Sequence, residues 1–325
     1  MCAKILTKPQ KIMARSTSKI ASKVAIANPL FPRLIIATRP WSFPAALSPL
    51  LITFSILYLD DNLDFVNAVL FSTGIVALQA AANLLNSFCD FRSGLDIPET
   101  AGDRTLVDAL VTKEEFPFLF LSVVGVWFVS FVSTLPFASP IFSQYVVAYV
   151  AGLALSVLYS AGTPPLKYIG FGDLAVFLSF GPLLVTAGTW ACAITPLSAD
   201  VGRVILTSFP AAILVVAILH ANNHRDMKED AKNSARTVSV RLGKEMSEYY
   251  YYFLVLSPPA IAGGMGLLLP GAKGLLGGVL VFPMAVNLVR MVNGRHVPRD
   301  IDAETAKMML IFGVLTSLGL LVVSA

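Results

Sequence analysis

Two polar stretches of this chain contain the residue types that could do chemistry, and both follow long apolar runs. Each has an asparagine, an aspartate four residues later and a further aspartate; they are Asn86, Asp90 and Asp96 in the first stretch and Asn222, Asp226 and Asp230 in the second. Residues four apart lie along one face of an α-helix, so each stretch presents its polar side chains together, although Asp96 follows a break at Gly94. Two such faces in corresponding places predict one shared site.

The oxygen-bearing side chains of these stretches favour a hard divalent cation. Mg²⁺ binds carboxylate oxygens at about 2.0–2.1 Å and usually keeps positions open for phosphate oxygens. The two stretches therefore predict Mg²⁺ ions that bridge the protein to a diphosphate. The nearby cations that would stabilise the remaining negative charge are Arg39, Lys167 and Arg225.

The elements that position these residues must cross a membrane. Of the 325 residues, 56% are hydrophobic and 14% are charged, and the mean hydropathy is +0.73, which is too apolar for a soluble domain of this length. A hydrocarbon core of roughly 30 Å needs about 20 apolar residues per helix. Nine runs meet this need, at 41–59, 65–88, 117–137, 141–159, 173–195, 203–220, 248–269, 273–292 and 306–324. We predict an all-α, multi-pass membrane protein whose surroundings are the lipid bilayer, with no nucleic-acid partner.

The distribution of basic residues predicts the orientation. When the spans are threaded alternately, every Lys and Arg except Arg203 and Lys273 falls on the same side as the N-terminus. Cytoplasmic faces are enriched in Lys and Arg, so we expect the N-terminus and both aspartate stretches on a cytoplasmic-type face. The sequence leaves open whether the membrane is an endomembrane, a mitochondrial or plastid membrane, or a bacterial plasma membrane.

The chain divides into a short tail and one domain. Residues 1–33 are basic, contain Ser and Thr, and precede the first acidic residue, Asp60. This composition is typical of an organelle-targeting segment and equally of a disordered tail near anionic lipid headgroups. Residues 34–325 form the catalytic domain in our interpretation.

Two further segments are expected at the same membrane face. Arg39 opens the first span, where it is either a ligand for the diphosphate or a positively charged topological anchor. The loop 159–173 contains Lys167, Tyr168 and several glycines. It is short enough to be held over a site between neighbouring spans, and the alternative for Lys167 is again that of an anchor.

A diphosphate attached to something that belongs in lipid suggests a polyprenyl diphosphate. Breaking its allylic C–O bond leaves a carbocation that tyrosine rings could stabilise, and an apolar interior would keep water away. An aromatic ring would then be alkylated. The alternatives are an ion-coupled secondary transporter, disfavoured because the acids cluster at one face, and a membrane scaffold, which does not explain the repeated spacing.

The two stretches, together with Asp103-Arg104-Thr105-Leu106-Val107-Asp108 and Asn222-Asn223-x-Arg225-Asp226, resemble the aspartate-rich motifs of the UbiA superfamily of intramembrane prenyltransferases. The similarity extends from Arg39-Pro40-Trp41-Ser42-Phe43 to Arg241-Leu242-Gly243, and within the superfamily it is to the animal-type members of the MenA-like branch.

This resemblance implies an all-helical fold of nine spans around a central cavity. It implies Mg²⁺-dependent transfer of a polyprenyl group, such as geranylgeranyl, to a naphthoquinone-type quinone precursor in menaquinone synthesis, with 4-hydroxybenzoate or homogentisate as the alternative acceptors. The residues it implies as Mg²⁺ ligands and catalytic groups are Asp90, Asp96, Asp226 and Asp230, with Lys167 and Tyr168 assisting. Those it implies for substrate binding are Asn86, Asn222, Arg39, Arg225 and Arg104.

Overall fold

The computed structural model describes residues 30–94, 105–108, 110–294 and 297–324. Within these residues, nine helical segments are long and apolar enough to cross a membrane, as the sequence predicts. In chain order they are η1 with α3 (Pro40–Leu59), α4 (Phe65–Ser93), α5 (Glu115–Ser133), α6 (Phe142–Ala161), α7 with η3 and α8 (Gly172–Cys192), α9 (Val201–Arg225), α11 (Val238–Leu268), η5 with α12 (Lys273–Val292) and α13 (Ile301–Ser324). The short helices are α2 (Leu30–Ala37), η2 (Leu166–Ile169), η4 (Pro196–Ser198) and α10 (Met227–Lys232).

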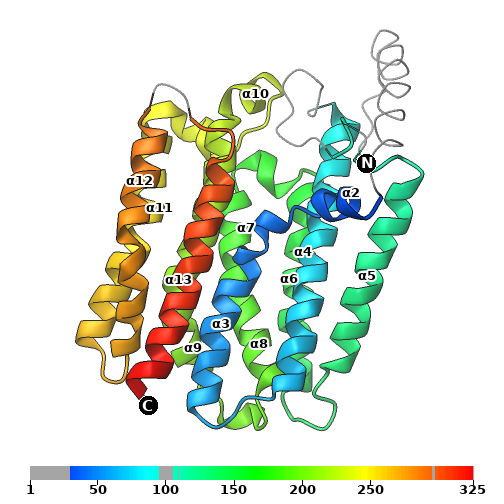
Figure 1. The fold of residues 1–325 in the computed structure, drawn as a ribbon. Coiled ribbons are helices and arrows are strands. Elements are labelled where there is room, and N and C mark those ends of the chain that lie inside the picture. The colour runs from blue at the N-terminus through cyan, green and yellow to red at the C-terminus, as the bar shows by residue number, and fades with distance from the viewer. Residues whose placement is uncertain (1–29, 95–104, 109, 295–296, 325) are drawn as a thin grey trace.

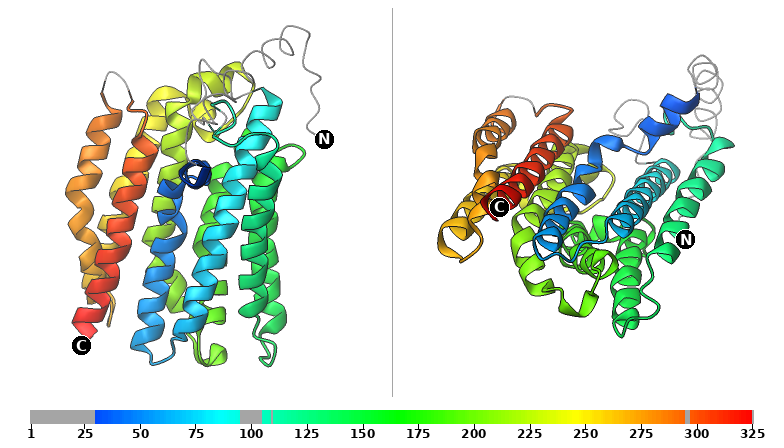
Figure 2. Two further views of the ribbon diagram at one scale, coloured as in Figure 1. Left: turned by 45° about the vertical axis from the view of Figure 1, so that its right-hand side comes forward. Right: turned by 60° about the horizontal axis from the view of Figure 1, so that its bottom comes forward.

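The spans stand side by side in one bundle. Helices α11, α12 and α13 form one side of it and α5 forms the other, while α2 and α10 lie at one end (Figures 1 and 2). Helix α9 is central, because 67% of its apolar part is buried, more than in any other span. Its Leu214 packs in one core with Val255 of α11 and Phe312 of α13, all fully buried.

Helix α5 shows the opposite pattern. Only 6% of its apolar part is buried, and Phe118, Leu121 and Phe128 are largely exposed. Apolar side chains on the outside of a membrane protein contact lipid tails, which are as apolar as the side chains themselves. The described span therefore fits a position at the lipid-facing edge of the bundle.

Two local features shape the interior of the bundle. The fifth span is kinked between α7 and α8, where Gly181 has non-helical backbone angles and Pro182 follows it. Proline lacks the backbone N–H and crowds the preceding turn, which breaks a helix. Helix α4 ends at Gly94, whose left-handed φ of 78° closes the last turn just after Asp90.

The helices extend further than the apolar runs from which they were predicted. Helix α4 continues to Ser93 and α9 to Arg225, while α11 begins at Val238 and changes direction at Gly243. Hydropathy detects only the part of a helix inside hydrocarbon, whereas backbone hydrogen bonding continues into the polar region. The described residues of the aspartate stretches consequently lie in helices or at their ends.

Candidate active site

A polar cavity of about 450 Å³ lies at the end of the bundle where α4 and α9 terminate. The described residues of both aspartate stretches line it, together with η2. Its lining includes all the predicted site residues that the structure describes, namely Arg39, Asn86, Asp90, Lys167, Tyr168, Asn222, Arg225, Asp226 and Asp230. Asp96 and Arg104 lie outside the described residues, so their roles stay predictions.

The first aspartate stretch is held by side chains from the end of α6 and from η2. Lys167 Nζ donates hydrogen bonds to Asn86 Oδ1 and Asp90 Oδ1, both at 2.5 Å, and the Tyr168 hydroxyl also donates to Asp90. Ser160 Oγ donates to Asn86 Oδ1 at 2.9 Å. Since an ammonium group can only donate, the amide oxygen of Asn86 is occupied, and its NH₂ group is left to donate to a ligand.

The segment η2, which carries these cationic and phenolic groups, is clamped to the chain that follows α10. The backbone N–H of Arg236 donates to Tyr168 O at 3.0 Å, and Arg241 Nη2 donates to Ile169 O at 2.8 Å. Gly170 has a left-handed φ of 78°, and a Cβ there would lie 2.4 Å from Arg241 Nε. The partners of the first stretch are therefore positioned by residues that follow the second.

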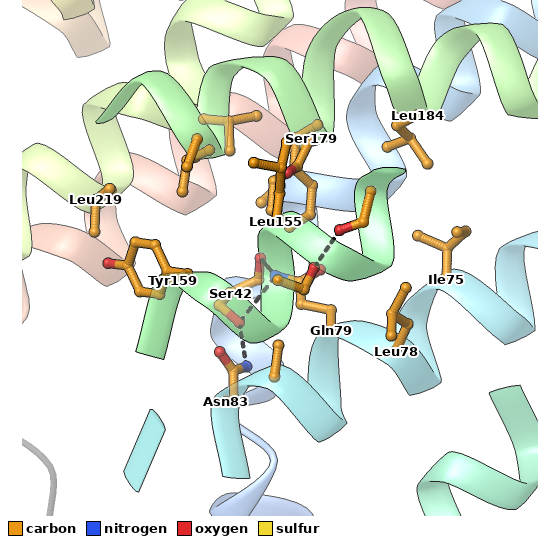
Figure 3. Close-up of a pocket in the computed structure, with 18 of the residues that line it drawn as sticks. Ser42, Ile75, Leu78, Gln79, Asn83, Leu155, Tyr159, Ser179, Leu184 and Leu219 are labelled. Carbon is orange, nitrogen blue, oxygen red and sulfur yellow. Dashed lines mark hydrogen bonds between the residues drawn. The ribbon is translucent and has the colours of Figure 1, made fainter. Parts of the chain in front are cut away.

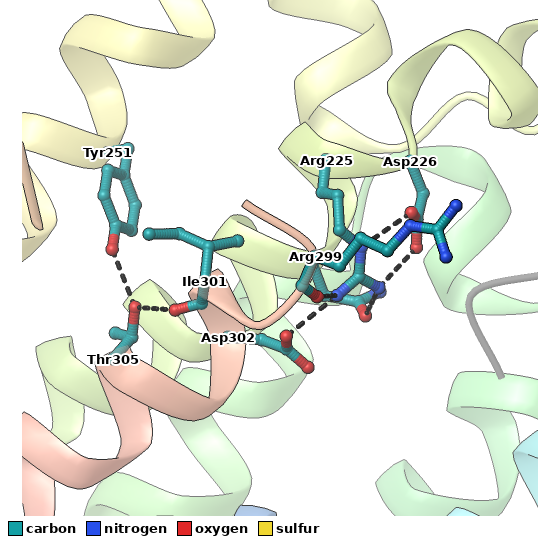
Figure 4. Close-up of polar contacts among 8 residues, drawn as sticks. Arg225, Asp226, Tyr251, Arg299, Ile301, Asp302 and Thr305 are labelled. Carbon is teal, nitrogen blue, oxygen red and sulfur yellow. Dashed lines mark hydrogen bonds and ion pairs between the residues drawn. The ribbon is translucent and has the colours of Figure 1, made fainter. Parts of the chain in front are cut away.

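The second stretch contains its own cation. Arg225 donates from Nε and Nη2 to the two carboxylate oxygens of Asp226, both at 2.8 Å, and from Nη2 to Asn222 Oδ1 at 2.6 Å. Its Nη1 donates to Asp302 Oδ1 at 2.8 Å and to Arg299 O at 2.7 Å (Figure 4). These contacts use all five guanidinium N–H groups. In this arrangement Arg225 positions the stretch, and the NH₂ group of Asn222 is left to donate to a ligand.

Of the three described aspartates in the two stretches, Asp230 is the one without an ion pair to a described Lys or Arg. Thr237 Oγ1 donates to its Oδ2 at 3.4 Å. Burial, and then repulsion from Asp226 and Asp90, raise the pKa of Asp230 to about 7 against the opposing effect of Lys167. A buried carboxylate that resists ionisation beside other carboxylates favours a bound cation.

Arg39 stands where the polar cavity continues into the bundle. Its backbone has a left-handed φ of 56° in the turn between α2 and η1, and the Ser42 hydroxyl caps that turn by donating to Arg39 O at 2.8 Å. Its side chain donates to Ser87 Oγ at 3.1 Å. A strained backbone at a cavity wall is common where a side chain has to be aimed at a ligand.

The donor set fits Mg²⁺, although it is not assembled as a metal centre. Among the residues that the structure describes, no group of three or more His, Cys, Asp or Glu side chains could hold an ion. Asp90 is paired with Lys167 and Asp226 with Arg225. Carboxylates nevertheless outnumber cations in the cavity lining, since Asp90, Asp226, Glu229, Asp230, Asp300 and Asp302 lie there with Arg39, Lys167, Arg225 and Arg299. Oxygen ligands of this kind are the ones that Mg²⁺ prefers.

An apolar cavity of about 230 Å³ adjoins the polar one inside the bundle (Figure 3). The two cavities share the lining residues Arg39, Trp41, Asn86, Tyr159, Asn222 and Asp302. Beyond these, the apolar cavity is lined mainly by aliphatic and aromatic side chains, among them Ile75, Leu155, Leu184 and Leu219. The combined space suits a molecule with an anionic head and a long apolar body.

Sequence reasoning missed two parts of this site. Asp302, in the first turn of α13, holds Arg225, but acidic residues are common in first turns and nothing distinguishes this one by pattern. Behind the second stretch, Ser247 Oγ lies 2.9 Å from His220 Nε2 and 2.8 Å from His224 Nδ1. This buried network joins α9 to α11, and its residues are far apart in the sequence.

The fold and the site together define a multi-pass membrane protein with a carboxylate-rich cavity at one end and an apolar cavity beneath it. The family model described as the UbiA prenyltransferase family matches residues 46–316. The chain therefore belongs to the UbiA prenyltransferase family, whose members are intramembrane prenyl-transferring enzymes, and the predicted resemblance is confirmed.

Curated relatives support the expected similarity to animal-type members. UbiA prenyltransferase domain-containing protein 1 of Homo sapiens is 30% identical, over 90% of this chain and 84% of its own length. The protein of the same name from Xenopus tropicalis is also 30% identical, over 90% and 82%. The one from Dictyostelium discoideum is 27% identical over 98% of this chain and 95% of its own length.

Solved structures share the fold. A UbiA homolog from Aeropyrum pernix K1 superposes with a TM-score of 0.61 at 16% identity and covers 92% of this chain and 100% of its own. A UbiA homolog from Archaeoglobus fulgidus, whose structure is bound to GPP and Mg²⁺, has a TM-score of 0.61 at 15% identity, with 89% of this chain and 99% of its own covered. The all-α, nine-span prediction is thus confirmed.

Proposed function

We propose that this chain transfers a polyprenyl group from its diphosphate to a naphthoquinone-type aromatic ring in menaquinone-type quinone synthesis, with Mg²⁺ as cofactor. The observation that carries the proposal is the junction of the two cavities, since a polar space that contains both aspartate stretches opens into an apolar one. The family membership and the GPP and Mg²⁺ in the Archaeoglobus homolog support the same substrate class.

The aspartates hold the metal in this proposal. Asp90, Asp226 and Asp230 line the cavity, and Asp96 joins them by the resemblance of its motif. Bound Mg²⁺ supplies positive charge that neutralises the diphosphate as it leaves. Asp90 would bind the metal as Lys167 moves away from it, and Asp226 would bind the metal through its remaining lone pairs while Arg225 stays in place.

The amide and cationic side chains bind the diphosphate. Asn86 and Asn222 offer NH₂ groups because their carbonyl oxygens are already occupied. Lys167 turns from Asp90 to the phosphate oxygens, while Tyr168, whose pKa is raised well above its usual value by burial and by Asp90, stays protonated and keeps donating. Arg39 completes the set from the cavity wall, with Arg104 assigned by resemblance alone.

The reaction follows from this placement. The allylic C–O bond breaks, the electron pair leaves with the diphosphate, and a ring carbon attacks the allylic cation to form the C–C bond. The ring then loses either a proton or, from a carboxylated ring such as 1,4-dihydroxy-2-naphthoate, carbon dioxide. The apolar cavity keeps water away from the cation.

The polar cavity then faces the cytoplasmic-type side of the membrane in our proposal, together with the N-terminus. This orientation is supported by the excess of Lys and Arg in the segments at that end of the bundle. The prenyl diphosphate enters with its head at that surface and its chain within the bilayer.

The test is a prenyl-transfer assay on the purified protein in nanodiscs. It supplies geranylgeranyl diphosphate, Mg²⁺ or EDTA, and a panel of 1,4-dihydroxy-2-naphthoate, menadiol, 4-hydroxybenzoate and homogentisate. We expect a prenylated naphthoquinol, which air oxidises to the quinone during work-up, and it should form only with Mg²⁺. Product from 4-hydroxybenzoate or homogentisate alone would replace the acceptor, and no product from a folded protein would favour the transporter interpretation.

A further inference from the structure

Gln79 is a polar residue in the middle of a membrane span. It lies midway along α4, one of the residues that line the apolar cavity, and its exposed fraction is 7%. Polar side chains inside a membrane are costly unless they have a partner or a function. The two hydrogen-bonding ends of this amide therefore have to be accounted for.

The nitrogen end is occupied and fixes the orientation of the amide. Gln79 Nε2 donates to Ser42 O at 2.8 Å and to Ser42 Oγ at 3.2 Å (Figure 3). A backbone carbonyl can only accept, so the nitrogen has to face Ser42 and the oxygen has to face away from it.

The oxygen end has no partner. Gln79 Oε1 is buried and accepts no hydrogen bond from any residue that the structure describes. A buried acceptor without a donor costs free energy comparable to a lost hydrogen bond. The neighbouring lining residues Ile75, Leu78 and Leu184 are aliphatic and cannot supply one. A molecule inside the cavity that carries an O–H or N–H group would supply the missing donor.

The proposed substrates differ in their ability to supply this donor. A prenyl chain has no O–H or N–H group, and its diphosphate is held at the polar end of the site. The aromatic acceptor carries ring hydroxyl groups. Along α4, Gln79 is about 16 Å from Asp90 at a helix rise of about 1.5 Å per residue, which leaves room for the diphosphate, the reacting carbons and a ring between them.

We propose that Gln79 Oε1 accepts a hydrogen bond from a ring hydroxyl of the aromatic acceptor and thereby selects hydroxylated rings and orients them toward the prenyl group. This rests on the proposed function and adds to it a binding site for the acceptor, on α4 and separate from the aspartate stretches. In this proposal Gln79 binds the acceptor and makes no contact with the diphosphate group.

The experiment compares a ring hydroxyl with its methyl ether in the wild-type enzyme and in Gln79→Met. Menadiol and its two monomethyl ethers are assayed under reducing conditions with geranylgeranyl diphosphate and Mg²⁺. We expect the wild type to prefer menadiol over at least one ether by tenfold or more in kcat/KM. In Gln79→Met that ratio should fall to near one, while the KM for the prenyl diphosphate stays within about twofold.

The matched control is Asn67→Leu, which replaces an amide on the same helix at a position that lines neither cavity. It should keep the wild-type ratio. A general structural defect in Gln79→Met lowers the activity with menadiol and ether alike and leaves the ratio unchanged, which would overturn the proposal. Equal use of menadiol and both ethers by the wild type would overturn it without any variant.

The experiment distinguishes failure of the proposed function from failure of the role proposed for Gln79. No prenylated product from any ring of the panel would contradict the proposed function and this inference with it. If another hydroxylated ring of the panel is the acceptor, the same comparison is made with that ring and its methyl ether. A ratio near one in the wild type would then reject the role of Gln79 while the transferase activity stands.

Discussion

Asp90 and Asp226 occupy equivalent positions, four residues after an asparagine, yet their carboxylates are neutralised in different ways. Asp90 pairs with Lys167, which comes from a different segment. Asp226 pairs in both oxygens with Arg225, its neighbour in the chain, and that arginine is fixed in turn by Asp302. The first half of the site thus has an exchangeable cation and the second half a fixed one.

The difference suggests that Lys167 and Arg225 have different roles on the two sides of the cavity. Lys167 has a flexible stem and a single ammonium group, so it can move from Asp90 to a phosphate oxygen. Arg225 uses its planar guanidinium to hold Asp226 in one orientation. Asp230, which has no such partner among the described residues, leaves the second half more anionic, and a metal would bind there in the proposed function.

The largest effect is expected from removing a charged ligand in either half. Asp90→Asn and Asp226→Asn should each lower kcat by about 10³, the upper end of what one electrostatic contact to the transition state contributes. Turnover is measured in nanodiscs, and membrane insertion is checked by size-exclusion chromatography. The control is Asp60→Asn, which affects an exposed ion pair with Arg203 and should keep full activity. Full activity in both variants would reject the metal assignment.

Lys167→Ala tests the exchangeable cation. Loss of the ammonium group should lower kcat/KM for the prenyl diphosphate by about 10², less than the loss of a metal ligand. Steady-state kinetics at varied prenyl diphosphate measure this. Lys244→Ala, at a largely exposed lysine that pairs with Glu248, should change nothing. Wild-type kinetics in Lys167→Ala would return Lys167 to the role of a topological anchor.

Asp302→Asn tests the fixed cation. Without the second carboxylate, Arg225 loses part of its support and no longer holds Asp226 rigidly. Changes to groups that orient a metal ligand typically lower metal affinity by about 10–100-fold, and we expect the lower part of that range. Mn²⁺ binding measured by electron paramagnetic resonance gives the dissociation constant directly. Asp300→Asn, two residues earlier and without a contact to Arg225, serves as the control. An equal effect there would contradict the specific role of Asp302.

The smallest effect is the pH dependence of metal binding. With a pKa of about 7, Asp230 is largely protonated at pH 6 and ionised at pH 8. A metal ligand has to lose its proton, so affinity rises with pH. We expect the Mn²⁺ dissociation constant to fall about tenfold between pH 6 and pH 8 for a single such proton. The same titration of Asp230→Asn should lose this dependence, and a flat profile in the wild type would contradict the uncompensated charge.

The sequence predicts most of the helical bundle that positions the two halves of the site. Nine apolar runs are visible because hydrocarbon requires continuous apolar helices. The spacing of Asn222, Asp226 and Asp230 predicts their four-residue backbone hydrogen bonds, but not that α9 ends at Arg225 and α10 begins at Met227 with Asp226 between them. Lys167 could be placed at the same face from topology alone. These features depend on local periodicity and length.

Other parts depend on contacts that no local pattern contains. The ion pair between Arg225 and Asp302 joins α9 to α13. Gln79 Oε1 has no donor among the described residues because the hydrogen bond from Gln79 Nε2 to Ser42 fixes the orientation of the amide. The amide oxygen of Asn86 is likewise occupied because the chain places Lys167 Nζ within hydrogen-bond distance of it. Such pairings depend on how distant segments pack, so the spacing of the stretches predicts the members of the site but not their roles.

The most direct test of the account is a structure of the protein with Mn²⁺ and geranylgeranyl thiodiphosphate, which binds without being readily cleaved. The anomalous signal of Mn²⁺ should lie between Asp90 and the Asp226–Asp230 turn, with Lys167 turned to the diphosphate and the prenyl chain inside the apolar cavity. Metal bound away from the two aspartate stretches, or a chain that lies outside that cavity, would contradict it.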